Sequence, residues 1–265
     1  ICIENREDVN VMNYEKEYAK KLTTPEEAVK IVKSGDWVDY GWCANHPRVL
    51  DKALAERMIK EPSLTDLKFR GGVALWMPEV AKIPNAKEQM CWNSWHASGY
   101  ERKLTDNGIG YYAPLRFSEL PRNYRDNIKH VDVTFIQVAP MDKHGYFNFG
   151  LSASDIAAVI EVSEKVVVEV NPLMPVVLGG TEVSVHIDDV DLIVENEGIP
   201  MADLPSGAPS EIDEAVAKLI VPEIPNGACL QLGIGGMPNA VGAMIAKSDL
   251  KDLSVHTEMY VDGFV

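Results

Sequence analysis

Three apolar stretches limit what this chain can fold into more than any other feature. Residues 64–76 (LTDLKFRGGVALW), 131–141 (VDVTFIQVAPM) and 165–171 (KVVVEVN) are rich in β-branched and apolar residues and lack clean alternation of polar and apolar positions. Strands that are covered on both faces, as in a parallel sheet, have this composition. Because helical stretches such as 155–165 (DIAAVIEVSEK) lie between them, we predict an α/β fold with largely parallel sheets.

The first part of the chain alternates helix and strand signals. Thr24 as an N-cap, Pro25 at the first helical position and Gly35 as a stop predict one helix. A short strand over 36–41 follows, and then a second helix that opens near Pro47. This order of elements is the one expected of βαβ units.

Residues 196–210 separate two domains in our prediction, because this segment is rich in glycine, proline and small polar residues and has no apolar period. We expect an N-terminal extension over 1–14, a first α/β domain over 15–195 and the start of a second, similar α/β domain over 211–265. Two strands and two helices cannot bury both faces of a sheet. The second domain is therefore predicted to be truncated in this chain.

The second domain is predicted to begin with a helix. Ser210 is a suitable N-cap, and Asp213 stands at the position that completes a capping box. The apolar residues of this helix have the spacing of one helical face: Ile212, Ala215, Val216, Leu219 and Ile220. A strand over 227–235, a helix over 237–248 and a strand over 253–261 are expected to follow.

Composition limits the compartment and the partners. The formal net charge of −15 repels nucleic acid and anionic membranes. Cys2, Cys43, Cys91 and Cys229 form no C-x-x-C pair, which indicates reduced thiols in a cytoplasmic protein. No apolar run approaches the ~20 residues that span a bilayer, and the first residues lack a signal-peptide pattern. We expect a soluble, untargeted protein.

A glycine-rich turn is the clearest candidate for a ligand site. The stretch LQLGIGGMPNAV places Gly233, Gly235 and Gly236 between a strand and a helix. Glycines let the backbone approach a ligand, and the unpaired N–H groups of a helix start attract negative charge. A tight turn that binds nothing has the same pattern. A dinucleotide fingerprint would use Glu258 as its later acid, but its third glycine falls at Pro238.

Acyl transfer would use the same loop and the same acid differently. A carboxylate with an ordinary pKa near ~4.3 is ionised at neutral pH and can attack a thioester without a general base. Backbone N–H groups of the loop would stabilise the resulting oxyanion, each worth on the order of 10²–10³ in rate. The candidate nucleophile is Glu258, although an acid that merely pairs with a cation at a strand end gives the same pattern.

Five ordered stretches resemble the acetyl-CoA hydrolase/CoA-transferase family: YAPLRFSELP, DVTFIQVAPMDKHGYFNFG, MPVVLGGTEVSVHIDDVDLIVENE, LQLGIGGMPNAV and HTEMYVDG. The resemblance covers the chain from about Tyr14 onward and is nearest to the butyryl-CoA:acetate and 4-hydroxybutyrate CoA-transferases. It implies ping-pong transfer of CoA from a short-chain acyl-CoA to a carboxylate such as acetate, through a covalent glutamyl-CoA thioester on Glu258. It also implies that the active site lies at the junction of the two domains.

The resemblance assigns roles to two further stretches. It implies a loop beside the thioester, formed by Gly233, Ile234, Gly235 and Gly236. It implies contacts with the substrate by Gln231 before this loop, and an opposite wall formed by Gly41, Trp42 and Cys43 in the stretch YGWCANHP. Close relatives often carry His where this chain has Trp42, so the preferred acyl group stays open.

The resemblance also bears on partners. Relatives continue for a further half with a second glycine-rich stretch that contacts CoA, so we expect a companion C-terminal half, and we expect a homo-oligomer. Coenzyme A is expected as a substrate and not as a permanently bound cofactor. No metal is predicted, because the histidines show no H-E-x-x-H or other ligand spacing.

Three alternatives stay open at this point. The first is a hydrolase of the same family, in which water replaces the acceptor carboxylate. The second is a nucleotide-binding module without catalysis. The third is a thiol nucleophile at Cys43 with His46 as its base, against which stands a buried structural cysteine.

Overall fold

The computed structural model describes residues 14–203 and 208–264. It divides the chain into two compact units, Ile1–Ala202 and Asp203–Val265, and the division falls inside the predicted linker. The predicted N-terminal extension lies outside the described residues except for Tyr14, as do residues 204–207 of the linker.

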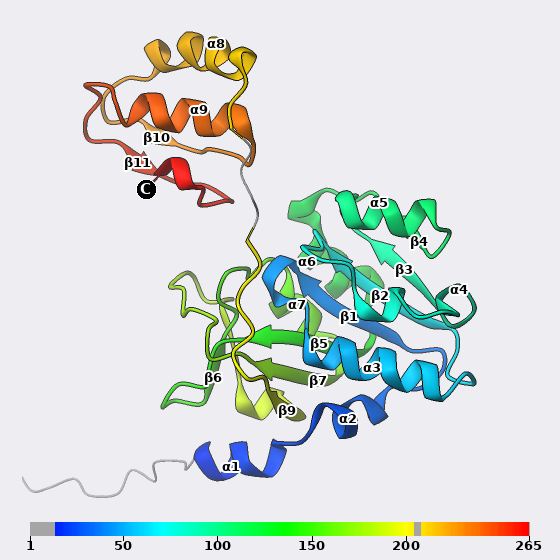
Figure 1. The fold of residues 1–265 in the computed structure, drawn as a ribbon. Coiled ribbons are helices and arrows are strands. Elements are labelled where there is room, and N and C mark those ends of the chain that lie inside the picture. Colours follow the sequence, from blue (N-terminus) through cyan, green and yellow to red (C-terminus); the bar gives the residue numbers. More distant parts are fainter. Residues whose placement is uncertain (1–13, 204–207, 265) are drawn as a thin grey trace, which may run out of the picture. The chain divides into compact units, whose positions relative to one another are not determined.

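A seven-stranded sheet forms the first unit, with the strand order β4-β3-β2-β1-β5-β7-β9 (Figure 1). Every pair of neighbours is parallel, which confirms the predicted α/β class. The strands are β1 Trp37–Trp42, β2 Leu67–Gly72, β3 Met90–Ser94, β4 Gly110–Tyr112, β5 Val131–Val138, β7 Ser163–Val170 and β9 Leu192–Glu195. A separate antiparallel pair consists of β6 Tyr146–Asn148 and β8 Ser184–His186.

Short helices connect these strands. The α-helices are α1 Tyr14–Lys21, α2 Pro25–Ala28, α3 Val49–Lys60, α4 Ala86–Gln89, α5 Gly99–Asp106, α6 Leu120–Asn123 and α7 Ile156–Glu161. Single turns of other helix types are η1 Val29–Ile31, η2 Cys43–Asn45, η3 Glu79–Ala81, η4 Phe117–Glu119, η5 Tyr124–Ile128 and η6 Ile187–Asp189. No described helix of either unit is both long enough and apolar enough to cross a membrane.

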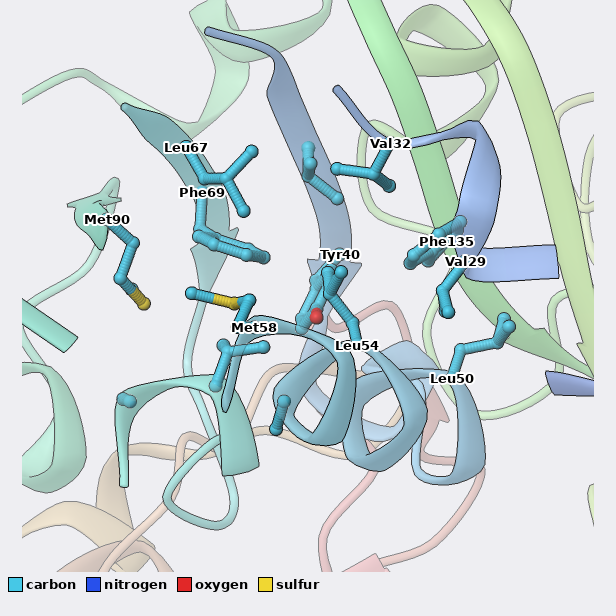
Figure 2. Close-up of a cluster of buried hydrophobic side chains, with 14 of the residues drawn as sticks. Val29, Val32, Tyr40, Leu50, Leu54, Met58, Leu67, Phe69, Met90 and Phe135 are labelled. Carbon is cyan, nitrogen blue, oxygen red and sulfur yellow. The ribbon is translucent and has the colours of Figure 1, made fainter. Parts of the chain in front are cut away.

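Both faces of the central strands are buried, as the apolar stretches predicted. Phe135 and Val167 belong to a cluster with α3, whereas the next residues along the strands, Ile136 and Val168, belong to a cluster on the opposite face with α7. Figure 2 shows the first cluster, in which Leu54 of α3 is fully buried. Loss of such a side chain to alanine costs about 2–5 kcal/mol, so these contacts fix α3 on the sheet.

Two predicted helices end earlier than expected. Thr24 caps α2 by accepting a hydrogen bond from the Glu27 N–H at 3.3 Å, but the helix ends in the turn η1 and not at Gly35. The helix predicted over 155–165 corresponds to α7, which ends at Glu161. It is followed by β7 because Ser163 already pairs with Val131 of β5. Strand pairing there prevails over the helical pattern of the sequence.

The second unit contains two helices and a two-stranded parallel sheet. Its elements are α8 Glu211–Ile220, η7 Val221–Glu223, β10 Cys229–Leu230, α9 Gly236–Ile245, β11 Ser254–Val255 and η8 Asp262–Phe264. The predicted capping box is confirmed, because the Ser210 side chain accepts the Asp213 N–H while the Asp213 carboxylate accepts the Ser210 N–H. Both strands are shorter than the stretches predicted for them.

The apolar face predicted for α8 is exposed. Ile212 is 76% exposed and Leu219 is 75% exposed, whereas Ala217 on another side of the helix is fully buried against α9 and its neighbours. An apolar helix face of this kind normally packs against a core. Within the described part of the second unit, this face remains uncovered.

Candidate active site

Two loops of the second unit leave the same edge of its sheet. In the parallel pair β10–β11, Leu230 is in register with Val255, and the His256 N–H donates to the Leu230 carbonyl at 3.0 Å. Parallel neighbours end at one edge. The glycine loop follows β10 and Glu258 follows β11, so the topology brings the predicted loop and the predicted nucleophile together.

Thr257 links these two loops. Its hydroxyl lies 3.4 Å from the carbonyl oxygen of Leu232 and 2.9 Å from that of Met259. Leu232 is buried in the core of the second unit and directly precedes the glycine loop. Thr257, which the sequence analysis did not single out, therefore ties the segment that carries Glu258 to the base of that loop.

The amides of the glycine loop are uncommitted. The N–H groups of Gly233, Ile234, Gly235 and Gly236 donate no hydrogen bond to any described residue. Gly235 has a φ of 133°, a conformation that L side chains rarely adopt, and a Cβ at Gly233 would meet no atom within 4 Å. The loop thus offers free donors beside open space at the start of α9.

Gly236 has a different explanation. A Cβ at this position would lie 2.9 Å from the Asp213 carboxylate of the capping box of α8. Close packing of α9 on α8 is therefore sufficient to require glycine here, whether or not a ligand binds.

The Glu258 side chain is exposed and uncommitted. It forms no ion pair or hydrogen bond with any residue in the described ranges. Gln231 is exposed ahead of the loop, and Ile234 within it is 48% exposed. These side chains can meet a ligand.

In the first unit, the predicted wall begins in a left-handed turn. Gly41 has a φ of 65°, and a Cβ there would lie 3.4 Å from side-chain atoms of Ile136 and Ile156. Its N–H donates to the Asp39 carboxylate at 2.9 Å. Cys43 also has a positive φ, of 51°, which is uncommon for a residue other than glycine. The turn is held in this shape by its surroundings.

Trp42 is packed into the first unit. Its side chain is only 6% exposed, and its ring meets the Phe117 ring edge-on with the centroids 5.2 Å apart. A Cβ at Gly72 would lie 2.6 Å from three carbons of the indole. The absence of a side chain at Gly72 thus creates the space that Trp42 fills.

His46 supports the turn from within the core. Its Nε2 lies 3.2 Å from the Gly41 carbonyl oxygen, and since a carbonyl only accepts, Nε2 carries the proton. Burial lowers the pKa of His46 to about 4, so the ring is neutral at neutral pH. Nδ1 is buried without a hydrogen-bond partner among the described residues. These contacts support a structural role rather than that of a base for Cys43.

Two buried carboxyl groups lie beneath the turn. Burial raises the pKa of Asp39, while the Tyr124 hydroxyl, which donates at 2.6 Å, and the Gly41 N–H partly offset this. Burial, and next the charge of Asp39, raise the pKa of Asp155 to about 7. Because each carboxylate disfavours the ionisation of the other, the charge of this pair beneath the turn depends on pH.

One group of side chains could hold a metal ion among the described residues. Ligand atoms of His130, Asp132 and Glu164 lie within 4.8 Å of one another. However, His130 Nε2 already lies 2.9 Å from Asp132, whose other oxygen accepts the Trp37 N–H at 2.7 Å. These contacts account for His130 and Asp132, and the group is not part of the predicted site.

An open parallel α/β unit, followed by a second unit that presents a glycine loop beside an acid, is the class that the fold and the site define. The chain belongs to the acetyl-CoA hydrolase/transferase family, because residues 6–205 match the model of the acetyl-CoA hydrolase/transferase N-terminal domain.

Named relatives agree with this assignment. Butyryl-CoA:acetate CoA-transferase of Anaerostipes caccae is 60% identical over 255 residues, which are 96% of this chain and 56% of that protein. 4-Hydroxybutyrate coenzyme A transferase of Clostridium kluyveri is 31% identical over 95% of this chain and 57% of that protein. The crystal structure of RipA from Yersinia pestis superimposes with a TM-score of 0.85 at 31% identity, over 95% of this chain and 59% of that one. The chain spans somewhat more than half the length of these relatives.

The structure brings together one part of the predicted site. Glu258, Gln231 and the glycine loop share one edge of the second unit, whereas Gly41, Trp42 and Cys43 lie in the first unit. That the two groups face each other across one active site stays a prediction. The sequence analysis missed Thr257 and also the buried polar side chains beneath the wall, although a charged Glu169 inside the apolar stretch KVVVEVN was a visible signal.

Proposed function

We propose that this chain carries the nucleophile and one wall of a CoA-transferase that exchanges CoA between a short-chain acyl-CoA, of the butyryl-CoA or 4-hydroxybutyryl-CoA type, and a carboxylate such as acetate. One observation supports this most. At one sheet edge the chain presents both the Glu258 carboxylate and four backbone N–H groups of the glycine loop, and none of these groups has a hydrogen-bond partner among the described residues. The relatives named as butyryl-CoA:acetate and 4-hydroxybutyrate CoA-transferases supply the substrate class.

The proposed reaction begins when a Glu258 carboxylate oxygen attacks the thioester carbonyl. The C–S bond breaks, the CoA thiolate leaves, and an acyl-glutamyl anhydride forms. The thiolate then attacks the Glu258 carbonyl, the donor acid leaves as a carboxylate, and a glutamyl-CoA thioester remains. The acceptor carboxylate reverses these two steps. In each addition, the amides of Gly233 to Gly236 would receive the negative charge on the carbonyl oxygen.

The remaining predicted contacts complete this proposal. Gln231 would touch the acyl or acceptor group, and Gly41, Trp42 and Cys43 would form the opposite wall at the junction of the two domains. Coenzyme A is the substrate, and no permanently bound cofactor is needed for the chemistry. The thiols of Cys91 and Cys229 form no disulfide with any described residue, which supports a reducing, cytoplasmic setting.

We also propose that the active enzyme includes a companion C-terminal half and assembles as a homo-oligomer. Two observations support the companion half. The chain spans 56% of its butyryl-CoA:acetate CoA-transferase relative. The apolar face of α8, with Ile212 and Leu219 exposed, is of the kind that further chain of the same domain would cover.

Replacement of the nucleophile tests the proposed function. Glu258→Gln removes the charge that attacks the thioester but keeps the shape, so CoA exchange between butyryl-CoA and labelled acetate should fall by at least 10⁴-fold in the assembled enzyme, on the order of a lost covalent nucleophile. Glu223→Gln, an exposed acid of the same unit, is the matched control and should change little. Full activity of the first variant, or thioester loss without acetate that outruns exchange, would contradict the proposal.

A further inference from the structure

A buried polar network lies at the carboxyl ends of four adjacent strands of the first unit, β1, β5, β7 and β9. Gln137 ends the α3-facing side of β5, and Glu169 is its register partner on β7. Asn171 follows β7, Asn196 follows β9, and Asn45 lies in the turn after β1. Each of these side chains is at most 6% exposed. Buried polar groups are costly unless they form hydrogen bonds. Among the side-chain polar atoms of these five residues, only Asn45 Oδ1 is buried without a hydrogen-bond partner within the described part of the chain.

The network first holds the turn that follows the predicted wall. The Gln137 Nε2 donates to the carbonyl of Ala44 at 2.8 Å and more weakly to that of His46 at 3.4 Å. In return, the Asn45 Nδ2 donates to the Gln137 main-chain carbonyl at 2.9 Å and to that of Phe149 at 2.7 Å. The segment directly after Cys43 is thus fastened to β5 by side chains on both sides.

The network next holds the start of α3. One Glu169 carboxylate oxygen accepts the N–H groups of Arg48, Val49 and Leu50 at 2.9, 3.0 and 3.1 Å. A carboxylate at a helix N-terminus satisfies amides that have no partner within the helix. The sequence predicted that this helix opens near Pro47. These three hydrogen bonds explain why it begins at Val49 instead.

The network finally holds the root of the linker to the second unit. The Asn171 Nδ2 donates to Gln137 Oε1 and to the Ile199 carbonyl, both at 2.7 Å. The Asn196 Nδ2 reaches Gln137 Oε1 at 3.2 Å and Glu169 at 2.9 Å, while its Oδ1 accepts the Gly198 N–H at 2.9 Å. Asn196 directly, and Ile199 through Asn171, are therefore linked to the side-chain amide of Gln137 that also binds the carbonyls of Ala44 and His46.

The Gln137 amide can satisfy these partners in only one orientation. Its NH₂ group faces two carbonyls, and its oxygen faces two asparagine NH₂ groups. A flipped amide would place donors against donors and acceptors against acceptors. One side chain thus fixes both the turn after the wall and the place where the chain leaves the first unit.

We propose that Gln137 is a positioning residue of the transferase, which sets the predicted wall Gly41–Cys43 and the linker root in one rigid arrangement. This inference rests on the proposed function, because it gives the wall a place in the reaction. Gln137 itself touches no reacting atom in this account; it acts through the carbonyls of Ala44 and His46 and through the two asparagines.

The test combines local hydrogen exchange with steady-state kinetics. Gln137→Met keeps the length of the side chain but removes its donors and acceptor, so amides in 43–50 and 196–199 should exchange at least tenfold faster than in the wild type. In the assembled enzyme, kcat/KM for butyryl-CoA should fall about tenfold or more. Thr134→Val is the control, since Thr134 is fully buried on β5 but bonds Ser163 on the other face of the sheet. It should leave both segments and kcat/KM near wild type.

Gln137→Glu separates positioning from a general loss of structure. Its acceptor oxygen is kept, but an ionised carboxylate would face the carbonyls of Ala44 and His46 and the neighbouring Glu169. Protonation restores one donor, so the deficit of this variant relative to wild type should shrink as pH falls, whereas that of Gln137→Met should stay constant. Glu169 is present in all the proteins, and in Gln137→Glu its carboxyl group acts in the same direction, because two adjacent carboxyl groups hinder each other's ionisation.

The outcomes decide the two proposals separately. Wild-type exchange in both segments of Gln137→Met, or equal loosening in Thr134→Val, would overturn the network inference. Loosened segments with an unchanged kcat/KM would overturn the positioning role and leave the proposed function standing. An active Glu258→Gln enzyme would overturn the proposed function, and the exchange measurements would still judge the network.

Discussion

Replacing Glu169 by alanine should measure how much the buried network stabilises the first unit. The change removes the acceptor of three backbone N–H groups at the start of α3, of which that of Leu50 is buried and those of Arg48 and Val49 are partly buried. An unsatisfied buried donor costs about 1–3 kcal/mol. Two effects reduce the total cost of the three donors. The variant no longer pays the desolvation cost of the Glu169 carboxylate, whose pKa is raised by burial, and water can enter the space that the side chain leaves. We expect a loss of about 3–5 kcal/mol, which lowers Tm by roughly 6–20 °C.

Tryptophan fluorescence during urea unfolding is a suited assay. Trp37, Trp42, Trp76, Trp92 and Trp95 are the tryptophans of the whole sequence, and all of them belong to the first unit. The signal therefore reports the unfolding of that unit alone. Glu164→Ala, an exposed acid on the same strand, is the control and should change stability by less than about 0.5 kcal/mol. A loss below about 1 kcal/mol for Glu169→Ala would refute the reasoning.

Two further predictions concern stability and assembly. Burial raises the pKa of Asp51 from 3.8 to about 7, so between these pH values the folded state keeps a proton that the unfolded state has released, and stability falls as pH rises. Asp51→Asn should flatten the curve of unfolding free energy by up to about 1.4 kcal/mol per pH unit in this window; an unchanged slope in urea titrations would contradict it. Purified residues 1–265 should not turn over until the companion half is added, and Leu219→Lys should block its co-elution and the recovered activity, whereas Glu214→Lys on the polar side should not. Turnover by the chain alone, or equal binding by both variants, would count against the companion half.

The architecture of the first unit was predictable because its signal is local. Runs such as VDVTFIQVAPM carry apolar residues on both faces, and the structure places Phe135 and Ile136 in clusters on opposite sides of a parallel sheet. The caps at Thr24 and Ser210 were predictable for the same reason, since a cap and its partner are three residues apart.

Helix ends set by distant residues were not predictable. The start of α3 at Val49 depends on Glu169, which lies 120 residues further along the chain. Likewise, the end of α7 depends on the register of Ser163 with β5. Periodicity describes one element at a time, whereas these boundaries follow from tertiary hydrogen bonds.

Part of the arrangement of the candidate site residues was predictable. That the loop and Glu258 share an edge follows from parallel strands, and the glycine pattern was visible in the sequence. The separate reason for Gly236, its contact with Asp213, and the link through Thr257 were not predictable, because both contacts join segments that are distant in the sequence. The roles of Gly41, Trp42 and Cys43 toward a substrate remain predictions.

Trapping of the covalent intermediate tests the central claim most directly. The assembled enzyme is mixed with butyryl-CoA and reduced with borohydride, which converts a glutamyl thioester to an alcohol and releases the CoA thiol, and the peptides are then analysed by mass spectrometry. The account predicts reduction at Glu258 alone, and none without butyryl-CoA. An unmodified Glu258 in enzyme that turns over, or a butyrylated Cys43 in a parallel sample that is not treated with borohydride, would contradict it.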